Sequence, residues 1–135
     1  MKIFTSLLLL SLLFGSCSRQ INQIPKEQNF SLNKSKTIES TVFTVTQIND
    51  SRCPVNTNCI VAGKAEVFLS MSNKDENVNL IFCIGADCKA GINNDQTSIK
   101  IGKQNYRIQL ISVNPVNSTT PTQKAKTAQI KITTL

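Results

Sequence analysis

Five cysteines are the residues of this 135-residue chain best suited to specific chemistry. Four of them stand in two close pairs, Cys53 with Cys59 and Cys83 with Cys88, separated by five and four residues. Paired thiols can form disulfides, bind zinc as thiolates, or carry redox chemistry. Redox sites use the tighter Cys-x-x-Cys spacing, and zinc arms usually have about two to four intervening residues. These pairs therefore favour structural disulfides, and we expect no metal site and no cofactor.

The disulfide pairing of these four cysteines can be local or crossed. Proximity favours the local pattern, Cys53 with Cys59 and Cys83 with Cys88, because turn-forming residues inside each pair let its ends approach. Each local bond would contribute roughly 2–2.5 kcal/mol by loop closure. A cross pairing such as Cys53 with Cys88 would close a longer loop and contribute about 4 kcal/mol. Energy does not choose between them, so cross pairing stays an alternative.

The fifth cysteine, Cys17, follows a segment with the features of a secretory signal. Lys2 supplies a positive charge, an apolar run extends from Ile3 to Phe14, and the small residues Gly15 and Ser16 come next. The apolar run is shorter than the ~20 residues of a membrane-spanning helix. Export to an oxidising compartment also favours disulfides.

The stretch Leu13-Phe14-Gly15-Ser16-Cys17 resembles the lipobox of bacterial lipoprotein precursors, with Phe14 where Leu, Val or Ile is usual. This resemblance implies that residues 1–16 are a cleaved signal peptide and that Cys17 becomes a lipidated N-terminus held in the membrane. It leaves an even set of cysteines for disulfides. Ser18, rather than Asp, follows Cys17. In such lipoproteins this favours the outer membrane over the inner membrane, so we expect a lipid-anchored protein of the cell envelope.

The elements that must position the paired cysteines are β-strands. Residues 17–29 include the lipidated Cys and a polar segment that we interpret as a flexible tether, and 30–135 as a single domain. Apolar residues alternate with polar ones in this domain, as in Val78, Leu80 and Phe82. The pattern predicts an all-β fold, a small antiparallel sandwich or barrel of about seven or eight strands. Good helix formers over 62–72 leave a helix there as an alternative.

A second motif runs from Asp50-Ser51-Arg52-Cys53-Pro54 through Cys59 to Ala62-Gly63-Lys64-Ala65-Glu66-Val67. It resembles a D-S-R-C-P…C…A-G-x-A-x-V signature of small exported bacterial proteins and lipoproteins of uncharacterised function. That resemblance implies a fold but no activity. Physically the motif suits a disulfide-stapled corner between strands, with a rigid recognition loop as the functional hypothesis. The candidate residues of that loop are Asp50, Arg52, Pro54, Val55, Asn56, Thr57 and Asn58.

Composition narrows the functional classes further. The absence of histidine excludes Ser-His-Asp and Cys-His catalysis. Fifteen basic residues against eight acidic ones give a formal charge of +7, but no block of basic residues occurs and aromatics are 5%. Nucleic-acid binding is therefore not expected. A weak attraction to acidic polymers or lipid headgroups is compatible with the charge.

These observations favour a non-enzymatic, lipid-anchored envelope protein that binds an envelope protein or acidic polymer, or serves a structural role. One alternative is an inhibitor of an envelope protease that uses the Cys53–Cys59 loop, since a bridged loop lowers the entropy cost of docking. The other is a carboxylate- or metal-dependent enzyme. The acids at Asp75, Glu76, Asp87 and Asp95 are better interpreted as solvated turn residues.

Overall fold

The computed structural model describes residues 26–89, 95–120 and 124–135. The predicted signal peptide, Cys17 and the part of the predicted tether up to residue 25 lie outside the described residues. No helix long and apolar enough to cross a membrane occurs in the described ranges.

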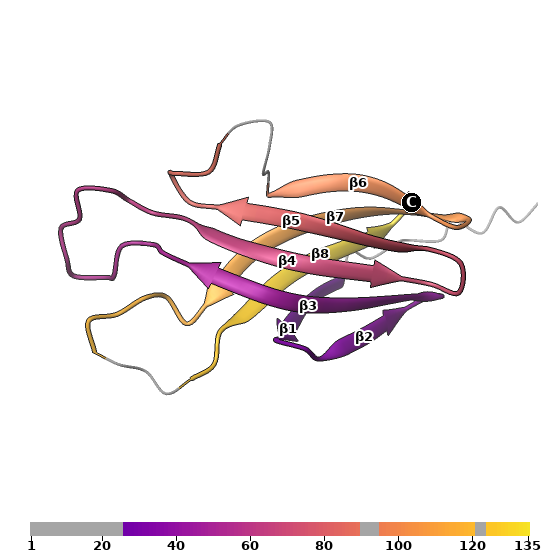
Figure 1. The fold of residues 1–135 in the computed structure, drawn as a ribbon, viewed down its shortest axis with the longest axis horizontal. Helices are drawn as coiled ribbons and strands as arrows, with labels where there is room; N and C mark the ends of the chain where they lie inside the picture. Colours follow the sequence, from indigo (N-terminus) through magenta and orange to yellow (C-terminus); the bar gives the residue numbers. More distant parts are fainter. Residues whose placement is uncertain (1–25, 90–94, 121–123) are drawn as a thin grey trace, which may run out of the picture.

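The described chain folds as a sandwich of two antiparallel sheets, each with four strands (Figure 1). One sheet has the order β1-β8-β7-β6, and the other has the order β2-β3-β4-β5. The strands are β1 (Lys26–Ser31), β2 (Ser35–Ile38), β3 (Thr41–Asp50), β4 (Ala65–Ser72), β5 (Asn77–Ile84), β6 (Gln96–Ile101), β7 (Gln104–Asn114) and β8 (Thr127–Thr134). The all-β sandwich predicted from the alternating pattern is thus confirmed.

Alternation of side chains builds the core between the sheets. Along β4 every second residue from Ala65 to Met71 is buried, and β8 repeats the pattern. Because successive strand residues point to opposite faces, this period of two gives each sheet one apolar inner face. The ring of Tyr106 packs edge-on against Phe43 across the core, with centroids 5.4 Å apart, and its hydroxyl donates to Thr41 Oγ1 at 2.9 Å.

Strand β1 begins earlier than the sequence predicts. It starts at Lys26, so residues 26–29 belong to the domain, where they pair with β8 from Gln129 to Ile132. Residues 65–72 form the expected strand and not the alternative helix, because β3 and β5 pair with β4 on its two sides. The β6–β7 hairpin has two loop residues, and Gly102, the first of them, supplies the positive φ that a primed turn requires there.

Candidate recognition site

Loops from both sheets meet at one end of the sandwich, which we call the loop pole (left in Figure 1). It comprises residues 51–64 between β3 and β4, 85–89 after β5, and the described residues 115–120 and 124–126 between β7 and β8. The first and last of these loops are joined directly: Val55 N donates to Asn117 O at 2.9 Å, and Val55 forms a β-bridge with Ser118. The loop pole is therefore one connected surface.

Asp50 lies at the base of the loop pole and connects its loops. It is the last residue of β3, and its side chain faces inward with only 3% exposure. Arg52 donates two hydrogen bonds to the carboxylate, from Nε to Oδ1 and from Nη2 to Oδ2, both 2.8 Å long. Lys126 Nζ lies 2.8 Å from Oδ2. One buried carboxylate is thus paired with two cations from different loops, which is an unusually well-compensated arrangement for a buried charge.

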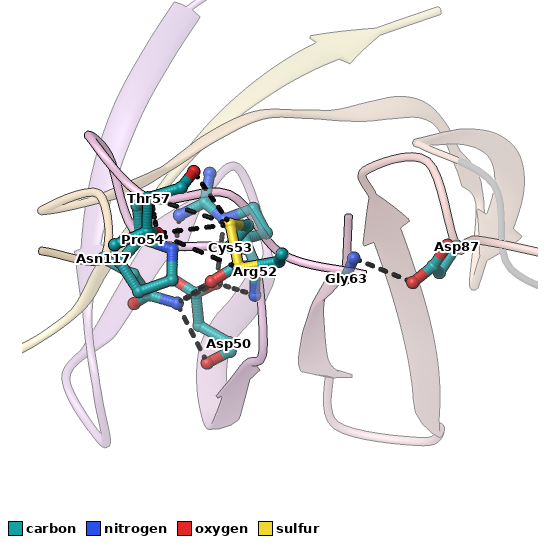
Figure 2. The surroundings of a disulfide bond; sticks show 9 residues. Asp50, Arg52, Cys53, Pro54, Thr57, Gly63, Asp87 and Asn117 are labelled. Atoms are coloured by element: carbon teal, nitrogen blue, oxygen red, sulfur yellow. Dashed lines mark hydrogen bonds and ion pairs between the residues drawn. A yellow bond between two sulfur atoms is a disulfide. The ribbon is translucent and has the colours of Figure 1, made fainter. Parts of the chain in front are cut away.

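The same cations also bind backbone carbonyls. Arg52 Nη2 donates to Val113 O at 2.8 Å, and Lys126 Nζ donates to Pro115 O and to Asn117 Oδ1, both at 2.6 Å. Asn117 Nδ2 in turn donates to Arg52 O at 2.6 Å, as Figure 2 shows. These contacts give hydrogen-bond partners to backbone carbonyls in the loops and near the end of β7. They lock the β3–β4 loop onto the β7–β8 loop across the two sheets.

Electrostatics keep Asp50 ionised. Burial raises the pKa of its carboxyl, but hydrogen bonds from Arg52 and Lys126 outweigh that effect and lower the pKa to about 2. The pKa of Arg52 is raised in return by its hydrogen bond to Asp50. A carboxylate with this pKa and with its oxygens already bonded is a structural anion at neutral pH. It is poorly suited to donate or accept a proton in catalysis.

Two local disulfides staple the loops. Cys53 is bonded to Cys59 and Cys83 to Cys88, with Cα–Cα distances of 5.9 and 5.8 Å. This is the local pattern that proximity favoured, rather than the cross pairing. Within the first staple Thr57 Oγ1 donates to Pro54 O at 2.6 Å (Figure 2). The Cys53–Cys59 loop is consequently a closed turn, not an extended segment.

Gly63 and Asp87 connect the β3–β4 loop to the segment after β5. Gly63 has φ +77°, and a Cβ there would collide with the backbone of Ser51 and Arg52. Only glycine allows the two arms of the β3–β4 loop to approach so closely. The Gly63 N–H donates to the Asp87 carboxylate at 2.8 Å (Figure 2). Asp87, interpreted from sequence as a solvated turn acid, thus joins the second stapled turn to the first loop.

Four exposed apolar side chains lie on the loops of this rigid frame. The apolar tip, as we call it, comprises Val55, Ile60, Val61 and Val116, with exposures of 47, 105, 64 and 44%. No charged residue occurs from Cys53 to Gly63, although the chain as a whole carries +7. Half of the large hydrophobic side chains exposed in the described residues therefore belong to one end of the fold. Several exposed apolar side chains at one end of a domain make that end a candidate interaction site.

The predicted loop residues divide into two groups. Asp50 and Arg52 are structural: they hold the frame and are mostly buried. Pro54 is half-buried, and the side chains from Val55 to Asn58 are exposed.

Sequence reasoning missed several contributors. Lys126 binds Asp50 from 76 residues away, a separation over which local sequence carries no signal. Ile60 and Val61 are not among the candidate loop residues that the sequence suggested. Their position directly after Cys59, at the end of a disulfide-closed loop, was the sequence signal that could have placed them on an exposed tip.

No family model, curated protein or solved structure matches the chain. Within the described ranges, no group of three or more histidine, cysteine, aspartate or glutamate side chains is placed to hold a metal ion.

Proposed function

We propose that the chain is a lipid-anchored protein of the cell envelope whose β-sandwich binds another envelope protein through the apolar tip of the loop pole. The observation that carries this proposal is the combination of exposed Ile60 and Val61 with a frame of ion pairs and disulfides beneath them. A loop held rigid in its free state loses little conformational entropy on docking. Fully burying one Val or Ile side chain is worth about 1.5–3 kcal/mol, so the tip can act as a binding anchor.

The chemistry of the tip favours a protein partner over an acidic polymer. Its side chains are aliphatic, with Asn and Thr beside them, and Arg52 at its base is already engaged by Asp50. An acidic polymer would require free cations at the contact. An apolar socket on a protein requires the shape and desolvation that aliphatic groups provide.

The turn geometry also bears on the protease-inhibitor alternative. Asn56 has a positive φ of 65°, and the backbone N–H of Val55 is bonded to Asn117. A segment that binds by β-strand pairing needs an extended backbone with free N–H groups. This loop offers side chains instead, which favours docking into a socket.

Lipid anchoring in this proposal is supported by the lipobox resemblance at Cys17 and by two disulfides, which suit an oxidising compartment. Residues 18–25 can span at most about 26–29 Å. The described domain begins at Lys26, which pairs with Ile132 near the end of β8, and so lies at the end of the sandwich opposite the loop pole. Lys26, where the described domain begins, and the apolar tip therefore lie at different ends of the domain.

Site-specific photocrosslinking in cells tests this function. A photoreactive residue replaces Ile60 or, as a matched exposed control, Arg107 on the outer face of β7. We expect a discrete protein adduct from position 60 and none from position 107. Excess soluble wild-type domain should compete the adduct away, and a Val61→Asp domain should not. Equal labelling from both positions, or competition by the Val61→Asp domain, would contradict tip-mediated binding.

A further inference from the structure

The sandwich has four edge strands, and β5 differs from the other three. Strands β1, β2 and β6 each carry a lysine, at Lys26, Lys36 and Lys100, whereas β5 (Asn77–Ile84) has no charged residue and no proline. Lysines and prolines on edges prevent pairing with other chains. With eight residues, β5 is also longer than the edges of four and six residues. Among the four edge strands, β5 is thus the one that lacks charge, proline and short length, the usual protections against edge-to-edge pairing.

The backbone of β5 is available for pairing. Its register with β4 runs without a bulge from Ala65 opposite Ile84 to Ser72 opposite Asn77. In the described part of the chain, its backbone forms no hydrogen bond beyond this ladder, so every second N–H and C=O on the far side lacks a protein partner. A regular, unbulged strand with unpaired polar groups is a template for a further strand.

Side chains along β5 suit such an addition. The inward-facing Val78 and Leu80 pack against the core but stay only partly buried, because no strand flanks them on the outer side. On the opposite face Asn77, Asn79 and Ile81 are exposed. A further strand would extend the inner apolar face and bury the remaining surface of Val78 and Leu80.

We propose that β5 pairs with β5 of a second copy of this chain, in antiparallel orientation, and joins two sandwiches through one continuous eight-stranded sheet. We infer that the added strand comes from a second copy because β5 is self-complementary. Two antiparallel β5 strands place no like charges opposite each other. With Leu80 on the two-fold axis, Val78 lies opposite Phe82 of the other copy, apolar against apolar. Antiparallel pairing is also the arrangement that closes as a two-fold dimer rather than an open fibre.

Sedimentation velocity of the chain from residue 18 onward, which retains every described residue, tests this inference. We expect a concentration-dependent monomer–dimer equilibrium for the wild type. Asn79→Lys places a charge on the exposed face of β5, close to its counterpart in the dimer, and should weaken dimerisation about tenfold or more. Gln96→Lys, the same change at an exposed position of the already protected edge β6, should leave dimerisation within about twofold. A wild type that stays monomeric, or an Asn79→Lys variant that dimerises unchanged, would overturn the proposal.

Hydrogen exchange of the wild type provides a test that needs no variant. Amides of residues 77–84 should exchange more slowly as protein concentration rises into the dimer range, while those of β6 should not change. If amide exchange slowed at the loop pole instead of at β5, the dimer interface would lie at the apolar tip, and pairing through the β5 edge would be rejected. Failure of the β5 dimer would leave the proposed function unaffected, because photocrosslinking at position 60 detects only contacts made by the apolar tip.

Discussion

Asp50 connects the two sheets at the loop pole. Its carboxylate binds Arg52 from its own loop and Lys126 from the loop between β7 and β8. Because the carboxylate is 3% exposed, removing its charge would leave both cations without their partner in a poorly solvated position. The frame beneath the apolar tip thus depends on one buried negative charge.

The lowered pKa of Asp50 predicts how the domain responds to acid. The folded pKa is about 2, below an unfolded value near ~3.9. The stability that this group contributes is therefore complete above about pH 4 and is lost as pH falls through about 2. The difference between these pKa values corresponds to roughly 2–3 kcal/mol of stability. Urea denaturation between pH 7 and 2 should show this loss in the wild type.

Asp50→Asn should be less stable than the wild type at pH 7 by about 2–4 kcal/mol, with the difference shrinking toward pH 2. Asp75→Asn, at an exposed turn position, is the matched control and should change stability little. A pH-independent difference between Asp50→Asn and wild type would show that the charge of Asp50 does not stabilise the loop pole.

Gly63→Ala is a second prediction at this scale. The added Cβ would meet the backbone of Ser51 and Arg52 at a positive φ, so the substitution should cost well over about 1 kcal/mol. Gly102→Ala is the comparison, since its φ is also positive but its new Cβ meets only the Asn73 side chain, which can move. Thermal melting should rank Gly63→Ala as clearly less stable. Equal melting temperatures would indicate that the loop can open without cost.

At the scale of elements, strand positions follow from alternation, but their ends and partners do not. Strand β4 was predicted as a strand with a helix as the alternative, and pairing with both β3 and β5 decides between them. Strand β1 starts earlier than expected because the polar residues 26–29 pair with β8 through backbone groups, which side-chain patterns do not reveal. The stapled corner was predictable from Cys53, Pro54 and Gly63, whereas the contact with Lys126 was not.

The Cys53–Cys59 bond should stabilise the domain modestly and order the loop. Replacing both residues with serine should lower the free energy of unfolding by about 2 kcal/mol, because the closed loop is short. Proteolysis should then cleave within residues 54–58 faster than in the wild type. Denaturant titration and timed proteolysis measure the two effects. An unchanged cleavage rate would mean that the ion pairs alone hold the loop.

At the scale of the whole molecule, the proposed roles occupy different surfaces. The chain enters the domain at Lys26, the apolar tip lies at the other end, and the β5 edge runs between these ends. An antiparallel β5 dimer would direct two tips toward opposite ends. If both copies are tethered to one membrane, their effective concentration rises and a weak edge contact becomes sufficient.

Lipid anchoring and disulfide formation can be checked together by intact mass spectrometry of the protein extracted from cell membranes. We expect a chain that begins at Cys17, carries fatty-acyl chains on that residue, and has its remaining cysteines oxidised as two disulfides. A mass that retains Met1, or a processed chain with free thiols at Cys53, Cys59, Cys83 and Cys88, would rule out this processing and oxidation.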